Sequence, residues 1–161
     1  MDALIHWLDN YIHGPALVFV VSMLPIIELR GTIPIGLAMG MDLWPTFILA
    51  YIGSCVPGPL IILFIRDVFK WLKTYPNWRR WIEKLEAKTL ARGDRTRKLG
   101  LFGLFLFVAI PLPGTGVWTG SLLSVLLGFR FIHSVIAVSL GNFVAGLLIL
   151  GLSYGVFNVI G

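Results

Sequence analysis

The chain has 161 residues, of which 57% are hydrophobic and 13% are charged, and its mean hydropathy is +0.88. A soluble domain of this size cannot bury so much apolar surface, so the composition predicts an all-α integral membrane protein. The net charge of +5 would suit nucleic acid, but 11 of the 13 Lys and Arg residues lie between Arg66 and Lys98, beside apolar segments. By the positive-inside rule this segment is cytoplasmic, and we expect no nucleic-acid partner.

Residues 1–14 predict a short helix in the membrane interface. Apolar and aromatic side chains between Leu4 and Ile12 share one helical face, whereas Asp2 and Asp9 lie elsewhere. Such aromatic residues anchor a helix at headgroup depth.

The next apolar block, residues 15–41, carries charges and helix breakers where a membrane span would not. These residues are Pro25, Glu28, Arg30, Gly31 and Pro34. Each intact piece has about a dozen residues or fewer, whereas a span needs roughly 20, so the block predicts a re-entrant helical hairpin. Charge and irregular backbone at this depth indicate a broken helix that lines a site. Residues 43–65 predict a transmembrane helix that completes a first repeat, 15–65.

Residues 66–98 form a basic insert. Trp78, Trp81, Ile82 and Leu85 fall at helical spacing, which predicts an amphipathic surface helix over 77–92. Its basic face could bind anionic membrane lipid, although a plain topology signal explains the same charge.

Residues 99–161 predict a second repeat of the same kind. A hairpin over 99–128 has its tip at Pro-Leu-Pro-Gly-Thr-Gly-Val-Trp-Thr-Gly (111–120), and a transmembrane helix follows over 131–158. Glycines recur along that last helix, and small residues allow helices to approach closely, so a homodimer is plausible.

A shift of 88 positions aligns the two halves without a gap from about residue 24 to residue 62. The matched helix breakers are Pro25 with Pro113, Gly40 with Gly128, Gly53 with Gly141, and Gly58 with Gly146. If each hairpin enters and leaves on one side, each half crosses the membrane once, which gives an inverted repeat with both termini outside. If the hairpins are instead full spans, the chain crosses four times and both termini are cytoplasmic.

In the re-entrant interpretation both tips reach the bilayer midplane. The second piece of each hairpin starts there, near Thr32 and near Val117, and its free N–H groups favour an anion beside Arg30. The second tip brings backbone N–H groups and hydroxyls but no charge, since no arginine follows it until Arg130. The predicted substrate-binding residues are Glu28, Arg30, Gly31, Thr32, Pro34, Pro111, Pro113, Gly114, Thr115, Gly116, Trp118, Thr119 and Asn142.

Glu28 has two interpretations of about equal weight. It could carry a proton in exchange for substrate, as intramembrane acids do, or it could neutralise Arg30 and cap the tip. For Arg66 and Arg130, at predicted helix ends, snorkelling to the interface is the ordinary explanation.

Nothing in the sequence indicates an enzyme, a cofactor or a metal site. There is no phosphate-binding P-loop, no His-Glu-x-x-His pattern and no serine elbow. His6, His13 and His133 do not have metal-ligand spacing.

Two segments carry a family resemblance: Glu28-Leu-Arg-Gly-Thr-Ile-Pro-Ile-Gly36 and Pro111-Leu-Pro-Gly-Thr-Gly-Val-Trp-Thr-Gly120. They resemble the two signatures of the small multidrug export protein family, which looks like a distant branch of the DedA superfamily. DedA members are described with two opposed re-entrant hairpins, and they include lipid scramblases and transporters of undecaprenyl phosphate. The resemblance implies that Glu28, Arg30 and the segment 111–116 form functional tips.

Three functions follow, in order of preference. The first is a transporter or flippase of an anionic amphiphile or lipid phosphate in the cell inner membrane, coupled to protons through Glu28. The second is an exporter of cationic amphiphilic drugs, with Glu28 as the acceptor of the cation. The third is a membrane scaffold that transports nothing, in which the charges only stabilise the tips.

Overall fold

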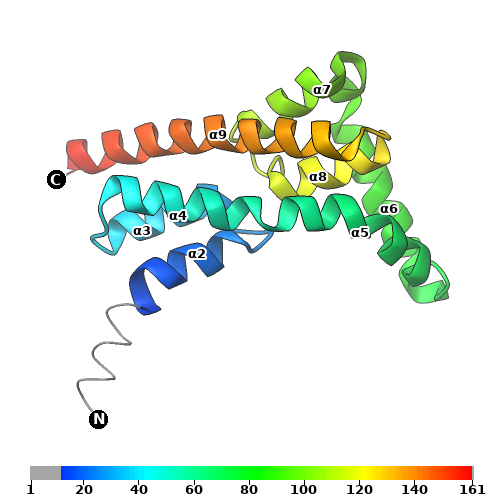
Figure 1. Ribbon diagram of the computed structural model, residues 1–161, viewed down its shortest axis with the longest axis horizontal. Helices are drawn as coiled ribbons and strands as arrows, with labels where there is room; N and C mark the ends of the chain where they lie inside the picture. Colours follow the sequence, from blue (N-terminus) through cyan, green and yellow to red (C-terminus); the bar gives the residue numbers. More distant parts are fainter. Residues whose placement is uncertain (1–11, 161) are drawn as a thin grey trace, which may run out of the picture. The chain divides into compact units, whose positions relative to one another are not determined.

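A computed structural model describes residues 12–160, and these residues are helical apart from turns (Figure 1). The predicted interfacial helix falls mostly on residues 1–11, outside the described part. A π-helical turn, Ile12–Ala16, comes first. The α-helices that follow are α2 (Leu17–Ser22), α3 (Glu28–Ala38), α4 (Leu43–Cys55), α5 (Pro57–Leu72), α6 (Pro76–Arg92), α7 (Asp94–Ala109), α8 (Val117–Leu126) and α9 (Phe131–Ile160).

Within the described part of the chain, two helical stretches are long and apolar enough to cross a membrane. They are Leu43–Leu72, formed by α4 and α5, and Phe131–Val156 in α9. They cover the two predicted transmembrane helices, although the first runs on to Leu72. The break between α4 and α5 falls at Val56, directly before Pro57 and Pro59, where prolines remove helical hydrogen bonds.

The chain divides into two compact units. Unit 1 holds the described residues up to Val56 together with those from Phe143 onward, and unit 2 holds Pro57–Asn142. Helix α9 therefore contributes its first part to unit 2 and the rest to unit 1.

Unit 1 packs the short helices α2 and α3 against α4. Its core combines Leu29 and Ile33 of α3 with Phe47 and Ala50 of α4, and Leu150 of α9 joins them. Phe47, Tyr51 and Phe143 add an aromatic cluster with ring centroids 5.5–6.2 Å apart. The unit is therefore held by apolar packing around α3, the helix that carries Glu28 and Arg30.

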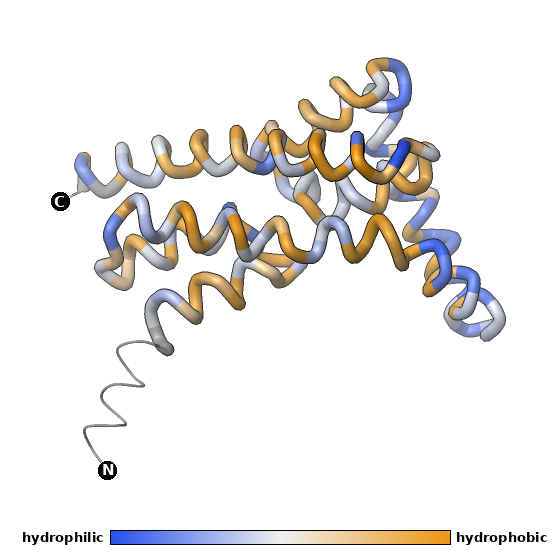
Figure 2. The backbone as a smooth tube through the Cα atoms, viewed as in Figure 1, coloured by the Kyte–Doolittle hydropathy of each residue, from blue (hydrophilic) through white to orange (hydrophobic). Residues whose placement is uncertain are grey.

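Unit 2 has two apolar clusters on opposite sides of α8. One joins α7, α8 and the first part of α9 through Leu104, Val117 and Val138. The other joins α5, α6 and α8 through Phe69, Ile82 and Leu122. Figure 2 shows hydrophilic residues gathered along α6 and at the start of α7, as the basic insert predicts.

The predicted surface helix at 77–92 is confirmed as α6, but its apolar residues do not share one role. Ile82 is fully buried and Leu85 packs against its cluster, whereas Trp78 and Trp81 are more than half exposed. The two tryptophans contact each other edge to face, with ring centroids 6.0 Å apart. Helical spacing alone did not separate the residues facing α5 and α8 from those facing outward.

One predicted helix start is wrong and the other is confirmed. The second piece of the first hairpin starts at Glu28 rather than near Thr32, so Thr32 and Pro34 lie inside α3. A proline removes only one helical hydrogen bond, and the buried residues Leu29 and Ile33 hold this turn in the core. In the second half, α7 ends at Ala109 and α8 starts at Val117, as predicted.

The elements of the two halves correspond at the offset of 88 residues found in the sequence. Shifted by 88, the start of α3 falls one residue before that of α8, and the start of α4 falls on that of α9. Gly40 and Gly128 match and have nearly equal positive φ angles, 79° and 76°.

The packing of two glycine pairs follows the same offset. A Cβ at Gly53 would meet the carbonyl oxygen of Phe19, and one at Gly141 would lie 2.6 Å from that of Phe105. Each long helix thus packs closely against the helix that precedes a tip. Gly58 packs against Val117 and Gly146 against Leu29, and these two partners are themselves 88 residues apart.

Candidate functional site

The first tip, residues 23–27 and the start of α3, places a buried carboxylate on strained backbone. Glu28 has φ = 48°, and the exposed fraction of this residue is 7%. A left-handed conformation at a residue other than glycine costs about 1–2 kcal/mol. Residues in such conformations cluster at functional sites, where the surrounding structure holds them. The Glu28 N–H donates to Leu24 O at 3.0 Å, which ties the strained residue to the start of the turn.

Arg30 lies two residues further along α3, partly buried, and interacts electrostatically with Glu28. Neither side chain is isolated, because both have polar or charged partners. Pairing makes a carboxylate and a guanidinium tolerable in apolar surroundings. The two predicted charges of the first tip therefore both lie in unit 1 and interact electrostatically.

The other predicted residues of the first tip support the helix start. Thr32 is buried, and its hydroxyl donates to Glu28 O at 2.5 Å. A Cβ at Gly31 would lie 2.7 Å from Cγ2 of Ile27, so a side chain there would press on the turn before α3. The Thr32 hydroxyl therefore bonds to the backbone of its own helix.

The second tip, Ile110–Gly116, contains a turn closed by hydrogen bonds. Thr115 N donates to Leu112 O at 3.2 Å, Pro113 occupies the second position, and Gly114 in the third has φ = 79°. This is the pattern of a type II turn. The Thr115 hydroxyl donates to Ile110 O and Leu112 O at 2.8 and 2.9 Å. The N–H and the hydroxyl of Thr115 thus serve the turn itself.

Arg92, at the end of α6, reaches the second tip. Its Nη1 donates to Gly114 O at 3.4 Å, and a Cβ at Gly114 would collide with the guanidinium. The sequence predicts that this tip has no charge. Its own residues carry none, but the structure brings the Arg92 guanidinium to it. We did not identify Arg92 from the sequence, because 21 residues separate it from Gly114.

A sharp kink in α7 brings Arg92 and Gly114 together. Gly100 has φ = 63° and ψ = −138°, which breaks the helix. Beyond it, Gly103 packs on the Thr96 backbone, where a Cβ would lie 2.8 Å from Cα of Thr96. A straight helix of this length would separate its ends by roughly 24 Å. The signal that could have revealed the contact is the pair of glycines at 100 and 103.

A cavity of about 470 Å³ opens beside this tip, within unit 2. Its only charged lining residue in the described part of the chain is Arg92, and Thr96 and Thr115 add hydroxyls. The other lining residues are mostly apolar, namely Leu99, Gly103, Leu106, Phe107, Ile110, Leu112 and Pro113. One cation on an otherwise apolar wall suits a ligand with a single anionic group and an apolar body.

The remaining predicted residues lie near α8 and in α9. Pro111 is half-buried, Gly116 is the residue before α8, and Trp118 and Thr119 in its first turn are half-buried. Asn142 is 3% exposed and has a polar partner. All of these belong to unit 2, whereas Glu28 and Arg30 belong to unit 1. Of these and the other predicted residues, Pro113 and Thr115 are among the described residues that line the cavity.

Sequence reasoning also missed a buried hydroxyl. Ser121 Oγ on α8 is buried, and within the described residues it has no hydrogen-bond partner. Ser124 differs, since its hydroxyl donates to Ser121 O at 2.7 Å. In an apolar helix a serine is ordinarily read as a small packing residue, so no pattern distinguished Ser121.

Two long apolar helices and two short-helix tips define a helical membrane protein, with no group of metal-ligating side chains among the described residues. Residues 28–148 match the family model described as "Putative small multi-drug export protein". The match covers most of the chain, and the protein belongs to this family. No curated protein and no solved structure matches the chain.

Proposed function

We propose that this protein is a transporter or flippase that moves an anionic amphiphile, such as a lipid phosphate, across the membrane. The observation that carries the proposal is the position of Arg92, the one charged side chain among the described residues that line the cavity of the second tip. A cationic drug would meet repulsion there.

The chemistry of the cavity fits a phosphate-bearing amphiphile. A guanidinium carries five N–H donors in a planar fork and binds phosphate through two parallel hydrogen bonds. Arg92 uses one donor on Gly114 O, at the long distance of 3.4 Å. Leu106, Phe107 and Ile110 would contact the apolar tail.

In this proposal the first tip contributes the coupling step. Glu28 takes up and releases a proton or acts as a gate, and Arg30 is the positive charge beside it. The buried carboxylate on strained backbone supports this role, because such strain often accompanies functional positions. The activity makes and breaks no covalent bond in the substrate, so the protein is not an enzyme, and it needs no cofactor.

The proposed architecture is an inverted repeat of two re-entrant hairpins in the inner membrane. Helices α2 and α3 have 6 and 11 residues, too few to span the bilayer, and the 88-residue offset relates the bounds of α3 to those of α8. Each half then crosses once, with the basic insert cytoplasmic and both termini outside. The resemblance to DedA proteins also favours this arrangement and a lipid-phosphate substrate.

The family description favours a second function, export of cationic amphiphilic drugs. Glu28 would then be the group that accepts the cation. Arg30 beside it and Arg92 on the cavity both oppose a cationic cargo. The non-transporting scaffold is the third possibility, and it predicts no flux of either class of molecule.

The test is flux through the purified protein in liposomes, with a fluorescent lipid phosphate and a cationic dye measured in parallel. Arg92→Gln should lower lipid-phosphate flux about tenfold or more, since a hydrogen bond to a charged group contributes about 1.5–3 kcal/mol. Arg80→Gln, on the same helix and exposed, is the matched control. Dye flux with no lipid-phosphate flux would establish the drug exporter, and unchanged lipid-phosphate flux in Arg92→Gln would refute the assigned site.

A further inference from the structure

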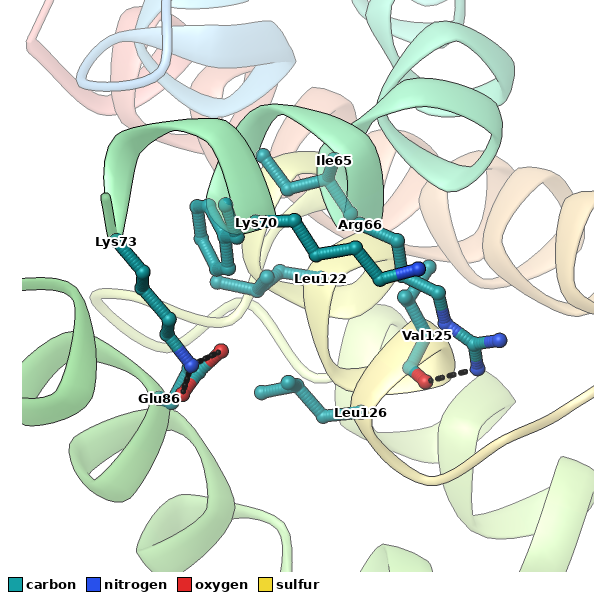
Figure 3. Close-up of a pocket in the computed structure, with 9 residues that line it drawn as sticks. Ile65, Arg66, Lys70, Lys73, Glu86, Leu122, Val125 and Leu126 are labelled. Atoms are coloured by element: carbon teal, nitrogen blue, oxygen red, sulfur yellow. Dashed lines mark hydrogen bonds and ion pairs between the residues drawn. The ribbon is translucent and has the colours of Figure 1, made fainter. Parts of the chain in front are cut away.

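A second cavity, lined by no residue of either tip, lies between the end of α5, Glu86 of α6 and α8 (Figure 3). Its volume is about 310 Å³, and it lies within unit 2. The lining residues are Ile65, Arg66, Phe69, Lys70, Lys73, Glu86, Leu122, Val125 and Leu126. The basic residues come from the last two turns of the candidate span Leu43–Leu72 and the residue directly after it.

The three cations of this cavity are unequally engaged. Lys73 Nζ pairs with both carboxylate oxygens of Glu86, at 2.8 and 3.0 Å. Arg66 donates from Nη2 to Val125 O at 2.9 Å, beside the carbonyl end of α8. Figure 3 shows both interactions, and it shows Lys70 extending in the direction of Arg66.

Lys70 has no counter-charge among the described residues that line the cavity. The one lining acid, Glu86, is occupied by Lys73. Arg66 and Lys70 are four residues apart on one helix, and like charges at that spacing repel. Arg66 retains four of its five N–H donors after its bond to Val125 O. The cavity therefore holds two cations with donors to spare above an apolar floor of Phe69 and Leu122.

Exposed aromatic residues surround the end of the same helix. Trp71 is 62% exposed and contacts Tyr75 edge to face, and Trp78 and Trp81 are exposed on α6. Tryptophan and tyrosine are enriched at headgroup depth, and basic pockets at the cytoplasmic ends of spans bind anionic headgroups. These residues place the cavity at the depth of lipid phosphates if Leu43–Leu72 crosses the membrane.

We propose that this cavity is a binding site for the phosphate group of an anionic membrane lipid, held between Arg66 and Lys70. The bound phosphate neutralises the two neighbouring cations, and the acyl chains follow the apolar surface of α5. Glu86 limits the affinity because it holds Lys73 away from the ligand. The site is separate from the transport proposal and does not require that any substrate be moved.

The experiment measures thermal stabilisation of the full chain in neutral detergent upon titration with phosphatidylglycerol, phosphatidylcholine or inorganic phosphate. Phosphatidylglycerol should stabilise the protein and phosphatidylcholine should not. Lys70→Gln should weaken the apparent affinity about fivefold, which is the loss in binding expected when one basic residue near an anionic lipid surface is removed. Lys88→Gln, on α6 and exposed but not in the cavity, removes the same charge and should leave the affinity unchanged.

Glu86→Gln provides the opposite test, since it frees Lys73 and should tighten phosphatidylglycerol binding. Stabilisation by inorganic phosphate with the same dependence on Lys70 would support the phosphate site and show that the acyl chains add little. Equal loss of affinity in Lys70→Gln and Lys88→Gln, or weaker binding by Glu86→Gln, would overturn the assignment. Because the readout is binding, a failure here leaves the flux experiment unaffected.

Discussion

The first and second tips sit at corresponding places in the two halves, but they hold their charge in different ways. At the first tip Glu28 and Arg30 belong to the tip's own helix and interact with each other. At the second tip the charge is Arg92, delivered from α6, and no acid lines its cavity within the described residues. The charges of the first tip are therefore local in sequence, whereas the charge at the second tip arrives through a tertiary contact. This difference shows that two segments with matching helix bounds need not obtain their charge in the same way.

The largest expected effect concerns the charged pair of the first tip. Glu28→Gln or Arg30→Gln should abolish transport, and each should cost about 1.5–3 kcal/mol in stability, because it leaves the partner uncompensated. The double substitution should destabilise the protein less than the sum of the two, and a double-mutant cycle of unfolding free energies measures that coupling. Asp42→Asn, an exposed acid in the same unit, is the control. Strict additivity would show that the two charges do not act as a pair.

A smaller effect tests the correspondence of the packing around the two tips. Gly53→Ala and Gly141→Ala should each destabilise the protein by about 1–3 kcal/mol, because a Cβ would press on backbone at Phe19 or Phe105. Gly151→Ala, where nothing lies within 4 Å, should be neutral or stabilising. Melting temperatures of the three variants decide the point. If alanine lowers the melting temperature at only one of the two matched positions, the packing around the two tips is not equivalent.

The smallest expected change in stability comes from alanine at Gly114 or Gly128. Comparing the two variants distinguishes the effect of backbone strain from the effect of moving Arg92 at the second tip. Gly114 and Gly128 have φ angles of 79° and 76°, so alanine should cost about 1–2 kcal/mol at either position. Only Gly114→Ala should also reduce lipid-phosphate flux, since its Cβ displaces the Arg92 guanidinium, whereas Gly128 has open space around it. Equal flux in the two variants would remove Arg92 from the mechanism.

Much of the helical framework could be predicted from the sequence because its signals are local. Prolines and glycines mark the breaks at Val56 and at Ile110–Gly116, and long apolar runs mark α4 with α5 and α9. The pairing of Glu28 with Arg30 is also local, as the residues are two positions apart. The exact start of α3 was missed because Pro34 suggests a break that the buried residues around it override.

The second tip could not be completed from the sequence because its charge arrives through a tertiary contact. In the sequence, Arg92 is only the last residue of a basic surface helix. The kink in α7 at Gly100 turns the chain back, so that the second tip lies beside Arg92. Arg66 is a second example. The sequence predicts that its side chain snorkels to the interface, whereas in the structure it donates to Val125 O on α8. Contacts of this kind depend on how helices pack, which residue spacing does not encode.

The comparison of the tips depends on the proposal that the halves are inverted in the membrane, and the topology of the chain tests it most directly. Reporters of membrane sidedness would be fused after Gly161 and inserted at Thr74, in the exposed turn between α5 and α6. The account predicts a C-terminal reporter outside the cell and a cytoplasmic reporter at Thr74. Both reporters in the cytoplasm would mean that the second hairpin is a full span, which contradicts the inverted repeat.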